Sequence, residues 1–487
     1  METLEMPAVN FAVVLQLLLV AGWGTILLLI DLAIPASQKR ITAYLAAGGL
    51  VAAAVIGALY WNTNASTFDG MIVLDNYAIA LNWIFALIGV IAIVIAIDYL
   101  PRHGIERGEF YPLILFATSG MMLLGQGTDL IVLFLGLEML SICLYILAGF
   151  AYQRISSEES AMKYLLIGAF AAGFLVFGIA LLYGATGSSN LAVIHETLSS
   201  QTLIAESYTF LLAGAALVTV GFSYKISMAP FHMWTPDVYE GAPTPVTAFM
   251  SVGAKVAGFA ALTRFLLVAL PTQAAIWVPA LAILAAITMI LGNVAAVAQS
   301  NVKRMLAYSS IGHAGYMLMG TLSGSERGIE GLLFYMVAYS LTNLGAFAVL
   351  IALERSGENA WDLADLAGLW QRRPWLAGAM ALCMLSLAGV PLTAGFFGKL
   401  YVFSAAWEAG LSALVIVGVF TSAISAFFYL RIIAQMFMRE PSRKTEANLT
   451  PDLTIGIALA TLGVVLFGLL PTPVIELAQQ SVLALAR

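Results

Sequence analysis

The sequence predicts an all-α polytopic membrane protein. Of its 487 residues, 61% are hydrophobic and only 10% are charged, whereas a soluble globular protein carries about 25% charged residues. The apolar residues form long continuous runs, not the alternating pattern of an outer-membrane barrel. A soluble enzyme and a disordered scaffold are excluded by this composition. A nucleic-acid-binding protein is excluded by the net charge of −6 and the absence of a basic stripe.

Apolar segments long enough to cross a membrane, at about 20 residues per span, follow one another along the whole chain. Fourteen are predicted: 11–33, 41–61, 77–99, 109–126, 129–151, 162–185, 208–227, 244–269, 275–298, 304–322, 329–353, 376–409 (interrupted), 411–437 and 453–470. Glu2 and Glu5 precede the first run, so we expect a true span there and no cleaved signal peptide. The short stretch 473–486 is expected to lie along the interface. The region 228–243, which contains Pro230, Pro236 and Pro243 and is followed by Pro245, is expected to be irregular.

Basic residues are distributed unequally between alternate loops, which bears on both the span count and the orientation. One set of loops contains only Arg264, Arg327 and Arg487. The other set contains thirteen basic residues: Lys39, Arg40, Arg102, Arg107, Arg154, Lys303, Arg304, Arg355, Arg372, Arg373, Arg439, Arg443 and Lys444. Because basic loops remain in the cytoplasm, we expect both termini on the outer side of the membrane.

Ionisable residues deep inside the apolar segments form the candidate site: Glu138, Lys225, Lys255, His313 and Lys399. A charge near the bilayer centre costs at least ~3 kcal/mol by insertion scales, so a passive span would avoid them. If these residues served only to hold helices together, Glu138 could pair with one lysine, but the other two lysines would stay unexplained. We therefore interpret these residues as a hydrated polar pathway.

The residue types in this pathway can exchange protons. Removal from water favours the neutral form of lysine and of glutamate, and histidine titrates near neutral pH. If Glu138 approaches Lys225, the pair favours the protonated lysine, and if it withdraws, the lysine releases its proton more readily. Hydroxyl residues lie at helical spacing from three of the charges and can order water beside them: Ser141, Tyr145, Thr247, Ser251, Ser309, Ser310 and Tyr316. Ser422, Ser425 and Tyr429 form a further stripe that contains no charge.

Three further residues are secondary relay candidates. Lys163 lies near a span end, where snorkelling to the interface is the simpler explanation. His232 lies in the proline-rich region, where a lone histidine usually makes local hydrogen bonds, and Tyr316 shares a helical stripe with His313. Asp237 and Glu240, also in that region, either gather protons or are simply solvated.

Two of the predicted spans are interrupted near a lysine. Pro230 follows Lys225 by five residues, and Pro391 precedes Lys399 by eight. Proline removes a backbone donor, and irregular backbone at membrane depth is tolerated only inside protein or along a cavity. Paired interruptions of this kind are typical of transporters built from repeats.

The interruptions lie in segments seven and twelve, which are five spans apart. Because five is odd, successive repeats would be inverted relative to the membrane. We therefore expect two inverted five-helix repeats with two interrupted helices. The predicted organisation is helices 1–3 in 1–108, a first antiporter-like repeat in 109–270, a second in 271–438, and helix 14 with a short tail in 439–487.

The chain carries no recognisable cofactor or metal motif. Cys143 and Cys383 lie inside apolar runs and are expected to be small buried hydrophobes, not a disulfide or cluster ligands. The sequence contains neither a Cys-x-x-Cys motif nor a glycine-rich dinucleotide motif nor a histidine pair at metal spacing. We expect the chain to move protons without redox chemistry of its own.

Four stretches resemble the antiporter-like, proton-pumping membrane subunits of respiratory complex I, the NADH–quinone oxidoreductases. They are LFLGLEMLSICLY, VGFSYKISMAPFHMWTPDVYEGAPTPV, SNVKRMLAYSSIGHAGYM and LSLAGVPLTAGFFGKLYVF. Within this family the chain is most similar to the subunit N branch. Subunit M typically has a glutamate at the position of Lys399, and subunit L typically has a long C-terminal lateral helix.

The resemblance implies a role for each matching residue. Glu138 and Lys225 would form a channel in one half, Lys255 would connect the halves, Lys399 would serve the other half, and His313 and Lys163 would be further polar positions. It also implies that quinone reduction in a separate arm drives the pumping. Flavin and iron–sulfur clusters would then belong to partner subunits of a complex in the bacterial inner membrane, with quinone as the substrate of the complex.

The resemblance also implies the partners: neighbouring antiporter-like and small helical subunits, and the lipid bilayer. Two other interpretations stay open. A subunit of a multi-subunit sodium/proton antiporter would share the interrupted helices and buried lysines. A membrane scaffold would use the same polar residues only for structure.

Overall fold

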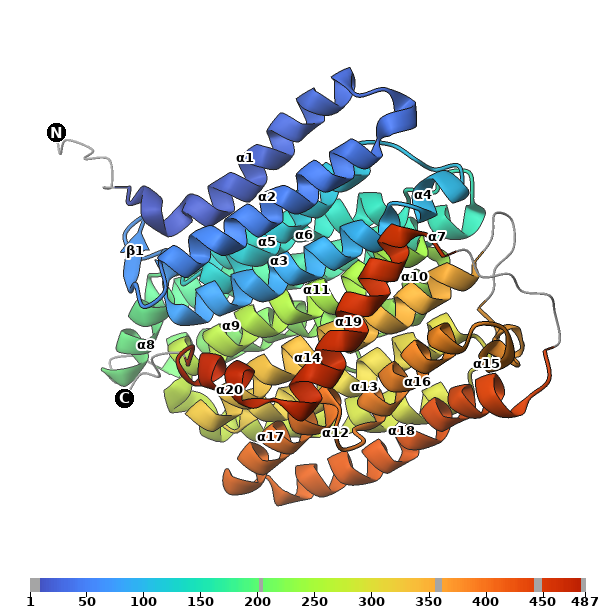
Figure 1. The fold of residues 1–487 in the computed structure, drawn as a ribbon. Coiled ribbons are helices and arrows are strands. Elements are labelled where there is room, and N and C mark those ends of the chain that lie inside the picture. Colours follow the sequence, from blue (N-terminus) through green and yellow to red (C-terminus); the bar gives the residue numbers. More distant parts are fainter. Residues whose placement is uncertain (1–8, 201–204, 355–360, 442–448, 483–487) are drawn as a thin grey trace.

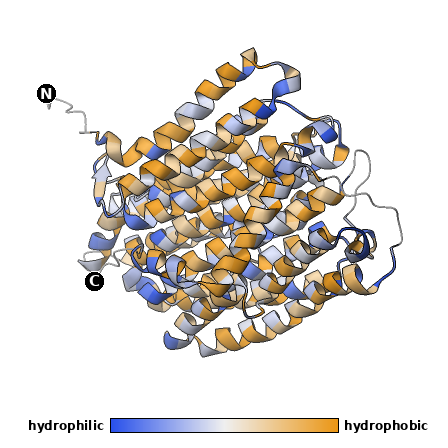
Figure 2. Ribbon diagram, viewed as in Figure 1, coloured by the Kyte–Doolittle hydropathy of each residue, from blue (hydrophilic) through white to orange (hydrophobic). Residues whose placement is uncertain are grey.

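The computed structural model describes residues 9–200, 205–354, 361–441 and 449–482. Over these ranges long helices run side by side in one bundle, and their ends gather at two opposite ends of the molecule (Figure 1). Hydrophobic residues cover most of the length of the helices, while hydrophilic residues collect mainly at the two ends and in the loops (Figure 2). This is the distribution expected of a bundle surrounded by lipid.

Each predicted apolar segment coincides with a helix, except 376–409, which divides into two. The long helices are α1 (Phe11–Ala33), α2 (Arg40–Leu59), α3 (Asn76–Ala96), α5 (Phe110–Gln126), α6 (Leu130–Ala148), α7 (Ile155–Thr186), α9 (Ala205–Lys225), α11 (Thr244–Arg264), α12 (Ala274–Val297), α13 (Val302–Leu322), α14 (Glu326–Leu353), α16 (Pro374–Ala388), α17 (Ala394–Glu408), α18 (Ser412–Met438) and α19 (Pro451–Leu469). Within the described ranges, eleven helices are long and apolar enough to cross a membrane. The chain is therefore a multi-pass, all-α membrane protein.

Short elements connect these helices. They are α4 (Tyr99–Arg102), α8 (Leu191–Ser199), α10 (Trp234–Gly241), α15 (Leu369–Arg372), α20 (Thr472–Gln479), the 3-10 turns η1 (Ala36–Gln38), η3 (Pro271–Gln273) and η4 (Leu363–Leu366), and the π-helical turn η2 (Phe265–Ala269). Strands β1 (Ala65–Thr67) and β2 (Ile72–Leu74) form an antiparallel hairpin. Asp75, Asp129 and Asn301 cap the starts of α3, α6 and α13, because their side chains accept otherwise unpaired backbone N–H groups.

Helices α11 and α14 form the centre of the bundle. In each of these two helices, 94% of the most hydrophobic 18-residue stretch is buried inside the protein, compared with 22% in the peripheral helix α12. Large apolar side chains on α7, such as Phe170 and Phe177, are instead exposed on the outside, where lipid would solvate them. Polar residues of α11 and α14 are therefore shielded from lipid on all sides. Cys143 and Cys383 are buried and unpaired.

The two interruptions have different structures. Helix α9 ends at Lys225, and irregular backbone follows until α10 begins at Trp234. Our expectation that the whole of 228–243 is irregular was wrong, because Pro236 lies in the first turn of α10, where a missing N–H costs no helical hydrogen bond. The second interruption separates α16 from α17, and Gly389 adopts a left-handed conformation there (φ +85°).

The two ends of the bundle differ in charge. At one end, which we call the basic end, lie the end of α4, the starts of α7, α11 and α13, and the end of α14, with Arg102, Arg154, Lys303 and Arg304. At the opposite end lie the β1–β2 hairpin, α8 and α20 (Figure 1). Asn76 donates a hydrogen bond to the Gln480 carbonyl there (2.9 Å), which ties α20 to α3.

Candidate functional site

The structure buries four of the five primary candidates within the bundle. Lys225, Lys255, His313 and Lys399 are at most 6% exposed and lie on α9, α11, α13 and α17. The fifth, Glu138, lies on α6 and is only half-buried. In the part of the chain that the structure describes, none of the three lysines forms an ion pair. Their positive charge is therefore not compensated by a direct carboxylate partner.

Lys225 is the last residue of α9 and contacts two hydroxyl groups. Its Nζ donates to Ser141 Oγ on α6 (3.0 Å) and to Tyr164 OH on α7 (3.2 Å). The same Nζ lies 5.3 Å from the centre of the Tyr164 ring, close enough for a cation–π contact. The end of an interrupted helix thus places a lysine among neutral oxygen atoms.

Glu138 does not contact Lys225 directly. Its Oε1 is buried and lacks a hydrogen-bond partner among the described residues. It lies three residues before Ser141 on α6, and therefore on the same helical face as the serine that binds Lys225. The structure therefore places Glu138 one turn of α6 from the serine that binds Lys225.

Lys255 lies in the middle of α11, and its Nζ donates to the Ser310 carbonyl on α13 (2.5 Å). One turn further along α11, Gly258 lies against Lys225: a Cβ added at Gly258 would be 3.5 Å from Lys225 Cβ. Lys225 therefore packs against α11 one turn from Lys255, and Lys255 in turn contacts the helix that carries His313.

His313 is held between two tyrosine hydroxyls. Its Nδ1 lies 2.8 Å from Tyr335 OH on α14, and its Nε2 lies 3.0 Å from Tyr429 OH on α18. Tyr429 OH also forms a short hydrogen bond with Ser309 Oγ, one turn before His313. Because hydroxyl groups both donate and accept, each ring nitrogen of His313 has a partner that can pass a proton in either direction.

Lys399 lies on α17, beside the second interruption. Its Nζ donates to the Ala388 carbonyl at the end of α16 (3.0 Å) and to Ser422 Oγ on α18 (2.8 Å). Gly389 leaves room for this side chain, since a Cβ there would be 2.9 Å from Lys399 Cδ. Lys399 Nζ also lies 5.1 Å from the centre of the Tyr316 ring. The interruption thus supplies both a free carbonyl and the space for the lysine.

The secondary candidates have different surroundings. Tyr316 lies within the buried row: its hydroxyl donates to Thr421 Oγ1 (3.2 Å) and accepts from Asn293 Nδ2 (2.9 Å). His232 is partly buried, and its Nδ1 has no partner in the described ranges. Lys163 lies at the basic end with a 40% exposed side chain, and it contacts none of the primary candidates.

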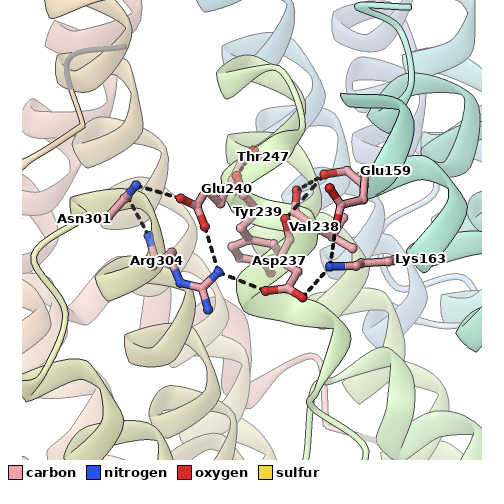
Figure 3. Close-up of polar contacts among 10 residues, drawn as sticks. Glu159, Lys163, Asp237, Val238, Tyr239, Glu240, Thr247, Asn301 and Arg304 are labelled. Carbon is pink, nitrogen blue, oxygen red and sulfur yellow. Dashed lines mark hydrogen bonds and ion pairs between the residues drawn. The ribbon is translucent and has the colours of Figure 1, made fainter. Parts of the chain in front are cut away.

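Lys163 belongs to a surface ion-pair cluster, together with Glu159, Asp237, Glu240 and Arg304 (Figure 3). Asp237 lies between Lys163 Nζ and Arg304, at 2.9 Å from each. Partial burial raises the pKa of Asp237, but hydrogen bonds from Lys163 and Arg304 lower it by more, so the net shift is downward. Asp237 therefore stays charged at neutral pH, and the cluster joins α7, α10 and α13.

Several residues that line the row were not singled out from the sequence. Tyr164 and Tyr335 bind Lys225 and His313, respectively, and Asn343 on α14 donates to Ser251 Oγ (2.6 Å). Each lies on a different helix from the residue that it contacts. A polar residue within an apolar run was the available signal, but only the packing of helices identifies its partner.

The fold and this buried row of lysines define a multi-pass helical membrane protein of the antiporter-like class. Residues 127–425 match the family described as NADH:quinone oxidoreductase/Mrp antiporter, TM. The chain is 60% identical to NADH-quinone oxidoreductase subunit N 2 of Roseiflexus castenholzii, with 99% of this chain and 98% of that protein covered. The chain belongs to the NADH-quinone oxidoreductase subunit N family. The resemblance seen in the four sequence stretches is thereby confirmed.

Solved structures agree with this assignment. A chain of respiratory complex I from Thermus thermophilus with bound aureothin is 35% identical and superimposes with a TM-score of 0.81, covering 95% of this chain and 99% of that one. A chain of the Mrp complex from Dietzia sp. DQ12-45-1b superimposes with a TM-score of 0.84 at 20% identity, with 97% of both chains covered. The second likeness concerns the fold alone, so the fold does not separate the two kinds of complex and the sequence does.

Proposed function

We propose that this chain translocates protons as a membrane-arm subunit of NADH-quinone oxidoreductase. The observation that carries the proposal is the row of buried lysines whose ammonium groups contact hydroxyl and carbonyl oxygens instead of carboxylates. In such a place a lysine gains little from remaining charged, so it can alternate between its protonated and neutral forms. His313, with a hydroxyl at each ring nitrogen, provides a two-sided link in the same row.

The relay runs from Lys225 through Lys255 and His313 to Lys399. Glu138 controls the first step: when its carboxylate moves toward Lys225 the protonated lysine is favoured, and when it withdraws the proton is released. The half-buried position of Glu138 on α6, on the face of Ser141, supports this role, because a shift of a neighbouring subunit could reach it. Conformational change elsewhere in the complex would thus be converted into proton movement.

Quinone reduction in partner subunits would drive the relay. Flavin, iron–sulfur clusters and the quinone pocket belong, on this proposal, to those subunits. The neighbours of this chain would be other antiporter-like and small helical subunits in a bacterial inner membrane. With the basic end in the cytoplasm, both termini lie outside. The two inverted repeats, 109–270 and 271–438, would each contain one interrupted helix.

The proposal is tested by removing the buried charges in the assembled complex. We expect Lys225→Met and Lys255→Met to lower proton translocation per NADH oxidised, measured by dye quenching in sealed vesicles, while the complex still assembles. Arg327→Met is the matched control, because Arg327 lies at the surface and forms an exposed ion pair with Glu408. Full pumping in both lysine variants would overturn the relay.

The alternative, a subunit of a multi-subunit sodium/proton antiporter, predicts different partners. Purification in mild detergent should bring down further membrane subunits together with an iron–sulfur arm that has quinone reductase activity. Isolation with other antiporter subunits only would favour the alternative, and isolation with neither would favour the scaffold interpretation.

A further inference from the structure

A carboxylate that the relay does not use, Glu354, is buried at the end of α14. Its side chain is 1% exposed. Its Oε1 accepts hydrogen bonds from Thr244 Oγ1 (2.5 Å) and Trp361 Nε1 (2.6 Å). Lys303 Nζ in turn donates to Thr244 Oγ1 (3.2 Å), so it stands one hydroxyl away from the carboxylate. Burying a carboxylate is costly unless it is hydrogen-bonded, and these contacts hold Glu354 in place.

A histidine faces the other oxygen of Glu354. His103 Nε2 lies 3.9 Å from Glu354 Oε2, and His103 Nδ1 lies 2.8 Å from the Arg154 guanidinium. Because arginine offers only donors, Nδ1 must accept, and the neutral ring carries its hydrogen on Nε2, toward Glu354. Burial, with help from Arg154, Arg102 and Lys303, lowers the pKa of His103 to about 4. A neutral imidazole therefore stands beside Glu354, and at 3.9 Å its Nε2 is too far away for a hydrogen bond to the carboxylate.

The remaining ionisable groups around Glu354 come from α4. Arg102 donates to the backbone carbonyl of Glu354 (3.3 Å) and to that of Ile351 (3.0 Å), so it binds the end of α14, not the carboxylate. The Tyr99 ring lies 4.0 Å from that of His103, centre to centre. With His103, Arg154 and Lys303, these groups surround Glu354 from α4 and the residue that follows it, from α13 and from the loop before α7.

A polar cavity lies directly outside this cluster. Its volume is about 380 Å³, and the charged residues of Figure 3 form its walls together with Trp361. Trp361 also donates to Glu354, and its ring lies 4.0 Å from Lys303 Nζ, measured to the ring centre. One indole side chain therefore separates a cavity at the basic end from a buried carboxylate.

Deeper in the bundle, two buried hydroxyl groups lie next to Lys255. Tyr239 OH and Ser310 Oγ have no hydrogen-bond partner within the described ranges, and the two side chains lie close to each other. Buried hydroxyls are normally hydrogen-bonded, and a polar space lined by several such groups binds water. The Ser310 carbonyl accepts from Lys255 Nζ, so water bound by these hydroxyls would adjoin the central lysine.

We propose that Glu354 takes up protons from the cavity at the basic end and delivers them, through water bound by Tyr239 and Ser310, to Lys255. The carboxylate accepts a proton from cavity water, and the neutral amine of Lys255 accepts that proton in turn, which leaves Glu354 ionised again. Trp361 is the gate, since its rotation exposes Glu354 to the cavity. This inference rests on the proposed proton translocation and adds a route by which protons enter the row at Lys255, its central lysine.

The direct test is Glu354→Gln in the complete complex. The amide oxygen can still accept from Thr244 and Trp361, but the side chain can no longer carry a proton. We expect a loss of proton translocation per NADH oxidised, with recovery in Glu354→Asp and no loss in Glu408→Gln, which alters an exposed carboxylate. Undiminished pumping by an assembled Glu354→Gln complex would overturn the proposal.

A second variant covers the case in which Glu354→Gln fails to assemble. Tyr239→Phe combined with Ser310→Ala removes two hydroxyl groups that have no partner in the described structure, so assembly should persist while pumping falls. Unchanged pumping in this double variant would contradict the route. If the Lys225→Met and Lys255→Met complexes also pump normally, the proposed function itself fails. If the lysine variants are impaired and the double variant is not, the relay stands and the uptake route through Glu354 does not.

Discussion

At the scale of single residues, the three lysines of the buried row have uncharged hydrogen-bond partners. Lys225, Lys255 and Lys399 each contact one or two hydroxyl or carbonyl oxygens. A carboxylate at hydrogen-bond distance would hold the lysine proton firmly, and the row would be a set of static ion pairs. Hydroxyls and carbonyls stabilise the ammonium less, which leaves both protonation states within reach.

The most specific residue-scale prediction concerns Tyr429. Tyr429→Phe keeps the ring in its buried place but removes the hydroxyl that contacts His313 Nε2 and Ser309. We expect lower proton translocation with normal assembly, because His313 loses one of its two proton-exchange partners. The measurement is the ratio of vesicle proton uptake to NADH oxidation.

Tyr183→Phe is the control for this prediction, because Tyr183 is exposed on the outside of the bundle. A normal ratio in the Tyr429→Phe complex would show that His313 does not exchange protons through this hydroxyl.

At the scale of elements, the interruption of a helix leaves a backbone carbonyl free to bind a side chain. Helix α16 stops at Ala388, and its carbonyl accepts from Lys399. The left-handed conformation of Gly389 turns the chain and leaves the space that Lys399 fills. The turn and the lysine site are therefore one feature of the structure.

Gly389→Ala tests this connection. The new Cβ would suffer the left-handed strain, about 1–2 kcal/mol, and would also meet Lys399 Cδ at 2.9 Å. Gly410→Ala is the matched control: its φ is +80°, but the space around it is open. We expect both variants to lose some thermal stability and only Gly389→Ala to lose pumping. Equal pumping in the two would show that the position of Lys399 does not depend on Gly389.

The junction of α4, α14 and the loop before α7 predicts a pH dependence of stability. The pKa of His103 falls from 6.5 to about 4 on folding, because of burial and then of nearby Arg154. A base with a lowered pKa contributes stability above its unfolded pKa and loses it on acidification. The equilibrium should therefore shift toward unfolding by about tenfold per pH unit between those two values.

The measurement for His103 is the stability of the purified subunit in lipid nanodiscs as the pH is lowered. His103→Gln should remove this component of the acid sensitivity, since glutamine does not titrate. An acid profile identical to that of the natural protein would exclude His103 as its source.

At the scale of the whole molecule, the sequence was sufficient for the order of helices but not for their neighbours. Long apolar runs determine where helices lie, and all fourteen predicted segments are helical. Helical periodicity places His313 on a face of its helix but cannot say that Tyr335 and Tyr429, from two other helices, meet it there. Glu354 was overlooked for the same reason: next to the end of a predicted span it resembles a solvated loop residue, and only packing buries it.

The orientation of the molecule gives the last prediction. The variant Gln38→Cys places a cysteine near the basic end. The variant Ser188→Cys places one near the end that contains the β1–β2 hairpin, beside α8. Because basic loops stay in the cytoplasm, we expect a membrane-impermeant maleimide added outside intact cells to label the cysteine at 188 and to spare the one at 38. The two natural cysteines are buried and give little background. In inverted vesicles the pattern should reverse, and labelling of the cysteine at 38 in intact cells would contradict both the proposed orientation and uptake at the basic end from the cytoplasm.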